Sequence, residues 1–252
     1  MNIEKDIKPS DLNLSVLQAS YDAQYETMDI EWREKNGYYK AKNIEEICKG
    51  RDFKNTLDVG SGDGSVLYWM DKSGFITGLY SLEISNSGIE RIKKRSIKSL
   101  KEVKKFNGYS IPYPDKNFEL VTCSHVMEHV EHPRLLLREI GRVSDFQCFE
   151  IPIDFSFFVD KKLNHFLAYG HVNIFTPSLF KFLLKSEGFD IIKEKFLFYP
   201  KETRKMVYKN PRTYWVNSLK NFVVESIPFL RKIKPNAYIV LCKKNKENLA
   251  IF

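Results

Sequence analysis

Short apolar runs alternate with amphipathic segments along most of this chain. The apolar runs have the length and composition of buried strands, and they fall at residues 56–59, 76–82, 119–123, 148–153, 189–198 and 237–242. Between them, apolar positions three or four residues apart predict helices at residues 65–72, 88–100, 134–143 and 178–187. Strands that alternate with helices form βαβ units, so the pattern predicts an α/β fold with a mainly parallel sheet.

Three further segments lie outside this alternation. Residues 1–50 have a helical pattern, an insertion at residues 154–176 is rich in Phe, and a second insertion at residues 199–236 is basic. Open α/β sheets bind ligands beyond the carboxyl ends of their strands, and both insertions leave strands at that edge. We therefore predict one domain over residues 1–252, in which the N-terminal helical segment and the two insertions form a lid on the substrate side.

A glycine-rich turn follows the first predicted strand. The segment reads T-L-D-V-G-S-G-D-G over residues 56–64, and its glycines permit positive φ and put no Cβ between the backbone and a ligand. The dinucleotide fingerprint is G-x-G-x-x-G, whereas Gly60, Gly62 and Gly64 form G-x-G-x-G, which is less suited to a pyrophosphate. Asp58 also argues against a pyrophosphate ligand, because a carboxylate repels phosphate and attracts an ammonium or sulfonium group.

A carboxylate follows this turn at a diagnostic distance. Glu83 ends the second predicted strand, L-Y-S-L-E, about twenty residues beyond the glycines. At such a position it can accept hydrogen bonds from both hydroxyls of a ribose. The turn resembles motif I of the class I S-adenosylmethionine (SAM) methyltransferases, and Glu83 resembles their ribose-binding acid.

Two later segments carry the same resemblance. Residues 107–121 resemble the family segment G-D-A-x-x-L-P-F-x-D-x-x-F-D, whose acid contacts the adenine amino group. Asn107 stands at that position, and its amide oxygen can accept the same hydrogen bond. Residues 124–143 are similar to the family's fourth-strand loop and next helix, although the usual L-K-P-G-G is missing after Val143. The resemblance implies a Rossmann-like, mainly parallel sheet of seven strands with an antiparallel last strand.

The resemblance also implies a cofactor and the residues that bind it. The cofactor is SAM, and the product is S-adenosylhomocysteine (SAH). The implied cofactor-binding residues are Asp58, Gly60, Ser61, Gly62, Glu83, Ile84, Asn107, Gly108, Ser124 and Tyr21. The last of these belongs to the N-terminal helix that would close over the cofactor. The chain is also similar to O-methyltransferases of bacterial capsule and glycan clusters, including those that methylate a phosphoramidate group.

Two histidines are candidates for the chemistry. Methyl transfer from a sulfonium is an in-line displacement, which depends mostly on holding donor and acceptor near attack distance. An oxygen nucleophile can use a general base, and histidine suits neutral pH. We predict that His129, at the end of the fourth strand, and His171, just before the helix at residues 178–187, are the catalytic residues.

The formal net charge of +8 is unevenly distributed. Residues 91–105 and residues 201–236 each have a net charge of +7, so the remainder of the chain is acidic. We expect residues 91–105 to be the solvated face of a helix. The second stretch mixes Arg204, Lys209 and Arg212 with aromatic residues, which suits an anionic group. The predicted acceptor is therefore a small, anionic metabolite or glycan precursor, with a phosphate or phosphoramidate type among the options.

The run His125-Val-Met-Glu128-His129 allows a second interpretation. H-x-x-E-H is the inverted zinc-protease pattern, but a peptidase needs it inside a helix with a third ligand, and here it follows a strand. Some family members that act on catechol-like substrates bind a divalent cation at this loop, and these three residues match those positions. We assign no metal, since Glu128 and His129 can brace the loop by hydrogen bonds.

The basic stretches allow a third interpretation, because they also suit nucleic acid. The chain would then be an RNA-associated methyltransferase, or an RNA-associated protein that keeps SAM binding as structure. It lacks the N-P-P-Y type of motif found in adenine amino methylation and the Pro-Cys used in cytosine attack. We therefore expect no nucleic-acid partner and favour the small-molecule acceptor.

The cysteines and the apolar runs bear on the cell compartment. The four cysteines form no C-x-x-C and lie in or near apolar runs, which predicts reduced, buried thiols. No stretch reaches the ~18 apolar residues that a bilayer span requires, and the first residues lack a signal core. These features predict a cytoplasmic protein without a transmembrane segment.

Overall fold

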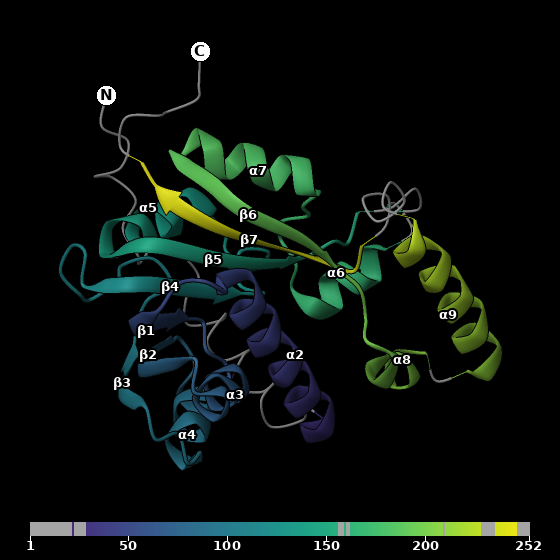
Figure 1. Cartoon of the computed structure of the whole chain (residues 1–252), viewed down its shortest axis with the longest axis horizontal. Coiled ribbons are helices and arrows are strands. Elements are labelled where there is room, and N and C mark those ends of the chain that lie inside the picture. Colours follow the sequence, from purple (N-terminus) through teal and green to yellow (C-terminus); the bar gives the residue numbers. More distant parts are fainter. Residues whose placement is uncertain are drawn as a thin grey trace.

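The structure, a computed structural model, describes residues 22, 29–155, 159, 162–208, 210–227 and 235–245 (Figure 1). The elements within these ranges are α2 (Ile30–Cys48), β1 (Phe53–Val59), α3 (Ser65–Ser73), β2 (Ile76–Glu83), α4 (Asn86–Lys94), β3 (Leu100–Lys105), β4 (Phe118–Ser124), α5 (Pro133–Val143), β5 (Ser144–Pro152), α6 (Leu163–Tyr169), α7 (Pro177–Ser186), β6 (Phe189–Leu197), α8 (Lys201–Val207), α9 (Pro211–Ser226) and β7 (Ala237–Lys244). Tyr21 and Lys209, both singled out from the sequence, lie outside the described residues.

Seven strands form one sheet in the order β3-β2-β1-β4-β5-β7-β6. The strands from β3 to β5 pair in parallel, whereas β7 runs antiparallel to both β5 and β6. The predicted α/β class, the seven strands and the antiparallel last strand are confirmed. The order of the strands reverses between β1 and β4, so the switch point at which open α/β sheets bind ligands lies there.

Helices cover both faces of this sheet (Figure 1). On one face α5 and α7 pack against strand residues such as Leu57 and Val121. On the other face α2, α3 and α4 pack against residues such as Leu79 and Leu120. Val121 and Leu120 are neighbours in β4 and belong to opposite cores, because successive side chains of a strand point to opposite faces. This double burial explains why the central strands read as continuous apolar runs.

The basic stretch at residues 91–105 is not the single helix that the sequence predicts. Helix α4 ends at Lys94, and Leu100–Lys105 form the edge strand β3, which pairs with β2. Lys101 and Lys105 remain exposed there. Charged side chains are typical of an edge strand, which they protect from pairing with another chain. The helical expectation was wrong because these lysines suit a solvated helix face and an exposed sheet edge equally well.

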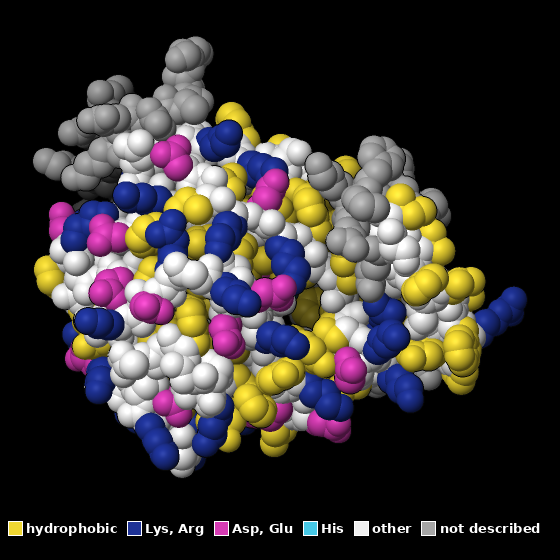
Figure 2. Space-filling model, viewed as in Figure 1, with side chains coloured by type: hydrophobic (Ala, Val, Ile, Leu, Met, Phe, Trp, Pro, Cys, Tyr) yellow, Lys and Arg dark blue, Asp and Glu magenta, His cyan; other side chains and the backbone are white. Residues whose placement is uncertain are grey.

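The second insertion holds helices α8 and α9 between the last two strands. Figure 2 shows hydrophobic side chains gathered over α9, at the right of the view. They include Trp215, Leu219 and Phe222, each more than half exposed.

Among the described residues, no helix has the length and apolar character needed to cross a membrane. All four cysteines are buried and unpaired, as the sequence predicts.

Candidate active site

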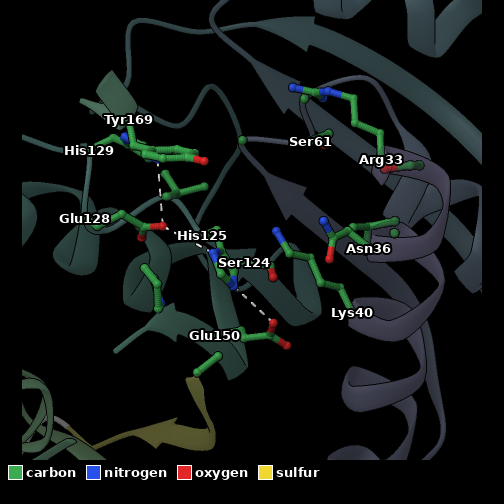
Figure 3. A pocket seen from close by; sticks show the side chains of 18 of the residues that line it. Arg33, Asn36, Lys40, Ser61, Ser124, His125, Glu128, His129, Glu150 and Tyr169 are labelled. Atoms are coloured by element: carbon green, nitrogen blue, oxygen red, sulfur yellow. Dashed lines mark hydrogen bonds and ion pairs between the residues drawn. The ribbon is translucent and has the colours of Figure 1, made fainter. Parts of the chain in front are cut away.

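A cavity of about 1120 Å³ lies beyond the carboxyl ends of the parallel strands. Its wall includes the glycine turn after β1, the end of β2, the loop after β4 and the end of β5. Helix α2 closes one side with Arg33, Asn36 and Lys40. Lys40 points toward His125 and Glu150, whereas Arg33 lies on the side of Ser61 (Figure 3). The two insertions also reach it, through Asp154, Tyr169 and His171 from the first and through Tyr199 and Met206 from the second.

The glycine turn has the backbone that its sequence predicts. Gly60, Gly62 and Gly64 have φ of 74°, 60° and 78°, a region that L side chains rarely adopt. The Gly60 N–H donates to the carbonyl of Leu82 (2.8 Å), which ties the turn to the end of β2. A Cβ on Gly60 would stand 2.4 Å from Cγ2 of Val126, so the β4 loop approaches the turn too closely for any side chain.

Glu83 is built into this turn. Its carboxylate is 3% exposed, and it accepts hydrogen bonds from the N–H of Gly62 (2.7 Å) and of Ser85 (3.0 Å). Burial raises the pKa of Glu83 to about 7, although these backbone N–H groups act against the shift. Each carboxylate oxygen has a second lone pair, so the side chain can accept further hydrogen bonds from a ligand in the cavity.

Asp58 and Ser61 complete the base of the turn. The Asp58 carboxylate is 3% exposed, accepts a hydrogen bond from the Thr122 hydroxyl (2.7 Å) and has its pKa raised by burial. The Ser61 hydroxyl donates to the carbonyl of Asp58 (3.0 Å) and accepts from the hydroxyl of Ser81 (2.8 Å). Both residues line the cavity, as do Gly60, Gly62 and Glu83.

The sequence analysis missed an ionic network on the outer side of the turn. Arg95 donates to the carbonyl (2.6 Å) and the carboxylate (2.8 Å) of Asp63, and it also pairs with Glu34 (2.6 Å). Arg33 lies 3.5 Å from the same Asp63 carboxylate. Burial acts to raise the pKa of Asp63, but the two arginines hold it below its usual value. The signal was present, since Asp63 stands inside the glycine motif, but its partners come from α2 and from Arg95, the residue that follows α4.

The other expected cofactor residues divide into two groups. Ile84, Gly108 and Ser124 line the cavity. The side chain of Asn107 does not; its oxygen accepts hydrogen bonds from the N–H groups of Tyr109 (3.0 Å) and Ser110 (2.7 Å). Both lone pairs of that oxygen are thereby used within its own loop.

The structure brings His129 and His171 together at the far end of the cavity, with ring centroids 4.9 Å apart. Nδ1 of His129 lies 3.0 Å from the carbonyl of Gly170, and Nδ1 of His171 lies 2.6 Å from the carboxylate of Asp154. Burial lowers the pKa of His129 and thus favours its neutral form. The predicted catalytic pair is therefore one cluster, although its members are 42 residues apart in the chain.

Asn173 holds these two segments in place. Its N–H donates to the carbonyl of Glu128 (2.9 Å), and its side-chain amide donates to the carbonyl of Val130 (2.6 Å). The loop after β4 is thereby attached to the segment that follows α6. The sequence G-H-V-N contained this residue beside His171, but nothing local indicated its partners.

The run from His125 to His129 forms a turn rather than a helix. His125 has φ of 55°, in the left-handed region that His tolerates better than most residues. Its Nε2 lies 3.2 Å from the carboxylate of Glu150, and its Nδ1 lies 3.5 Å from that of Glu128. The zinc-protease interpretation needs this motif inside a helix, so the structure removes it.

The cavity is acidic, in contrast to the basic chain. The Asp and Glu that line it are Asp58, Asp63, Glu83, Glu128, Glu131, Glu150 and Asp154, whereas the Lys and Arg are Arg33 and Lys40. Burial lowers the pKa of Lys40, although Glu150 and Glu128 act to raise it. Arg204 is 5% exposed and donates to the carbonyl of Tyr199 (2.7 Å) outside this cavity. The basic second insertion does not make the described cavity wall positive.

Comparisons with known proteins agree with this geometry. Residues 31–194 match a family model described as a methyltransferase domain. The Bacillus subtilis protein YrhH, which is named as a methyltransferase, is 32% identical to this chain over 89 residues. These residues make up 34% of this chain. The match spans about half of that relative's length, 49%.

Solved structures show the same fold. A SAM-dependent methyltransferase from Archaeoglobus fulgidus has a TM-score of 0.56 at 23% identity, with 84% of this chain and 94% of that chain covered. A Haloferax volcanii methyltransferase, solved in complex with the Trm112 methyltransferase activator, has a TM-score of 0.67 at 11% identity, with 88% and 96% covered. The family match extends from α2 to β6 and includes the glycine turn, Glu83 and the β4 loop. The chain belongs to the methyltransferase domain family, and its fold is that of SAM-dependent methyltransferases of known structure.

Proposed function

We propose that this protein is an O-methyltransferase that transfers the methyl group of SAM to a small hydroxylated metabolite or glycan precursor. The observation that carries the proposal is the cavity itself. It extends without interruption from Glu83 and the glycine turn to the pair His129 and His171. One end has the groups that bind a nucleoside, and the other has imidazole nitrogens suited to an acceptor hydroxyl.

The residues at the first end fit SAM. Glu83 would accept the ribose hydroxyls, and the exposed backbone of Gly60 and Gly62 allows close approach, because neither carries a Cβ. Asp58 would favour the positive charge of the donor. When bound, SAM supplies a sulfonium methyl group that is open to in-line attack. An adenine contact by Asn107 remains a prediction, and it requires the turn at Tyr109 and Ser110 to release the Asn107 oxygen.

The residues at the second end hold and orient the acceptor. A carbonyl oxygen only accepts hydrogen bonds, so the contact with Gly170 places the hydrogen of His129 on Nδ1 and its lone pair on Nε2. The same reasoning applies to His171 and the Asp154 carboxylate. Each Nε2 lone pair can receive the proton of an acceptor hydroxyl, and each can equally coordinate a cation. Residues 154–176 and 199–236 are proposed to cover this end.

The charges of the wall bear on the class of acceptor. Carboxylates outnumber Lys and Arg among the described residues of the cavity, which favours an uncharged hydroxyl over a free anion. The anionic acceptor expected from Arg204 and Arg212 draws no support from the described cavity, because neither residue lines it. The RNA-associated alternative relies on the basic stretches, and the burial of Arg204 removes one of their cations from the surface that RNA would contact.

The donor assignment is tested by SAM binding. Two hydrogen bonds from ribose to a carboxylate contribute roughly 1.5–3 kcal/mol each, so Glu83→Ala should weaken binding of SAM by about 100-fold or more in calorimetry. Glu90→Ala, on the exposed face of α4, is the matched control and should bind SAM as the wild type does. Undiminished affinity of Glu83→Ala would refute the ribose assignment. Transfer of labelled methyl from SAM to a panel of hydroxylated metabolites, sugars and nucleotide sugars then tests the acceptor class.

A further inference from the structure

The carboxylate of Glu128 is buried without the partners that a buried charge requires. It is 1% exposed, lines the cavity, and neither of its oxygens has a hydrogen-bond partner among the described residues. The nearest basic nitrogens are Nδ1 of His125 at 3.5 Å and Nε2 of His129 at 3.8 Å. A carboxylate in such surroundings is costly unless a cation or a hydrogen-bond donor approaches it.

The two histidines beside it direct lone pairs toward the same place. The Gly170 carbonyl fixes the hydrogen of His129 on Nδ1, and the Asp154 carboxylate does the same for His171. In the neutral form of each ring, Nε2 is then the nitrogen with the lone pair. Figure 3 shows the Glu128 carboxylate facing the His129 ring across the cavity wall. An oxygen and a nitrogen that both carry lone pairs repel each other unless a proton or a metal ion lies between them.

The spacing of these groups is close to that of a metal centre. One ligand atom from each of Glu128, His129 and His171 lies within 4.8 Å of the other two. Ligand atoms about 2.1 Å from a tetrahedral ion are ~3.4 Å apart, so the side chains need to close by no more than ~1.4 Å. Asp154, which holds Nδ1 of His171, supplies the carboxylate–histidine contact that commonly orients a metal-binding imidazole.

We propose that Glu128, His129 and His171 bind one divalent transition-metal ion of the type of Zn²⁺ or Co²⁺. Two imidazoles with one carboxylate suit such ions, whereas Mg²⁺ prefers oxygen ligands and retains several waters. Three protein ligands leave a coordination position open toward the cavity, as in catalytic rather than structural metal sites. The set differs from the run His125, Glu128 and His129 that the sequence suggested, because His171 from the first insertion takes the third place.

The role of the ion in catalysis rests on the proposed function. An acceptor hydroxyl that occupies the open position has its pKa lowered by the ion, and its proton passes to water. The oxygen then attacks the methyl carbon; the O–CH3 bond forms as the S–CH3 bond breaks, and the electron pair of that bond stays on sulfur. The histidines act as ligands in this step, and the ion offsets the negative charge of Glu128 and Glu150.

Metal titration of the full chain tests the proposal. Protein stripped with a chelator is titrated with Co²⁺, and binding is followed by visible absorbance and calorimetry, with Mg²⁺ as a comparison ion. We expect one equivalent of Co²⁺ to bind, competition by Zn²⁺, and no competition by Mg²⁺ at equal concentration. Glu128→Gln should weaken Co²⁺ binding by more than 100-fold, and Asp154→Asn by about 10–100-fold, because Asp154 acts through His171.

The controls separate this proposal from a purely structural role and from the proposed function. His132→Gln, which removes an imidazole from the start of α5, should bind Co²⁺ as the wild type does. Without metal, Glu128→Gln should raise the melting temperature, since it removes a buried carboxylate that accepts no hydrogen bond from the described residues; a carboxylate that merely braces the loop predicts the opposite. SAH affinity is measured on every sample. No stoichiometric Co²⁺ binding by protein that binds SAH would overturn the metal site alone, whereas Co²⁺ binding without SAH binding would overturn the proposed function alone.

Discussion

The two ends of the cavity are built in different ways. The donor end contains Glu83 and the glycine turn, and the acceptor end, proposed to hold the substrate, contains His129 and His171. At the donor end, the carboxylates of Glu83 and Asp58 each accept hydrogen bonds from neighbouring groups of the sheet and its turns. At the acceptor end, the carboxylate of Glu128 is as deeply buried but accepts none from the described residues. The carboxylates of the donor end thus have hydrogen-bond partners before a ligand binds, whereas the acceptor end contains a buried carboxylate that still lacks one among the described residues.

This difference follows from where each end comes from in the chain. The turn that contains Gly62 and the strand that ends at Glu83 belong to consecutive βα units, which are about twenty residues apart and adjacent in the sheet. His129 and His171 come from the β4 loop and from an insertion, and hydrogen bonds of Asn173 join the two. A site built from consecutive βα units is the same wherever the fold is the same. A site built from an insertion can differ between proteins of this fold that act on different substrates.

The largest effect that we expect to distinguish the two ends is a pH dependence of the free energy of unfolding that comes from Glu83 at the donor end. Glu83 ionises near its ordinary pKa when unfolded but near 7 when folded, so the folded protein binds the extra proton between about pH 4.5 and 7. Stability therefore falls as pH rises through this window, by up to about 3 kcal/mol at pH 8. Glu83→Gln should remove this slope in urea unfolding measured from pH 5 to pH 8.

Two comparisons sharpen this result. Glu102→Gln, at an exposed carboxylate of β3 whose pKa is lowered by the hydroxyl of Tyr113, is the matched control and should retain the slope. Saturating SAH should flatten the slope in the wild type, because ribose hydroxyls that bind the ionised carboxylate lower its pKa. If Glu83→Gln and the wild type show the same slope, Glu83 ionises normally and the donor end is more solvated than its geometry indicates.

The close approach of the β4 loop to the glycine turn is the point where the two ends meet. A methyl group at Gly60 would stand 2.4 Å from Val126, so Gly60→Ala should destabilise the protein by about 1–3 kcal/mol more than Gly74→Ala. Gly74 is the matched control, since it has φ of 69° and a Cβ added there would meet no atom within 4 Å. Urea unfolding of both variants gives the difference. The double variant Gly60→Ala with Val126→Ala should recover most of it; no recovery would show that backbone strain, not crowding, dominates.

The sequence predicted the donor end better than the acceptor end. Gly60, Gly62 and Glu83 could be identified because their role needs only a local backbone shape and a fixed spacing along two strands. His129 and His171 could be named but not paired, because their proximity depends on how the first insertion folds back. Glu128 was interpreted as a brace for its loop, and only its burial without hydrogen-bond partners points elsewhere.

Some parts of the fold were beyond the sequence for a similar reason. The strand Leu100–Lys105 was hidden because an edge strand rich in lysine has no buried face from which a period of two could be recognised. Arg33 and Lys40 reach the site from α2, and Arg95 reaches it from the end of α4. The packing of these helices is set by their apolar positions, which do not indicate where the polar side chains between them point. Local patterns predict elements, and tertiary packing decides which polar groups meet.

Asn173 gives the smallest expected effect and the sharpest separation of the two ends. Asn173→Ala removes the side-chain hydrogen bonds to the carbonyls of Val130 and Met127 but keeps the backbone bond to Glu128, so stability should fall by only about 1–2 kcal/mol. Because the two lost bonds join the β4 loop to the segment with His171, kcat for methyl transfer should fall about tenfold or more while SAH affinity stays unchanged. Asn217→Ala, which removes a comparable bond to the Thr213 carbonyl on α9, should change neither quantity. Equal losses of SAH affinity and kcat in Asn173→Ala would mean that the two ends respond as one unit, and the division between them would not hold.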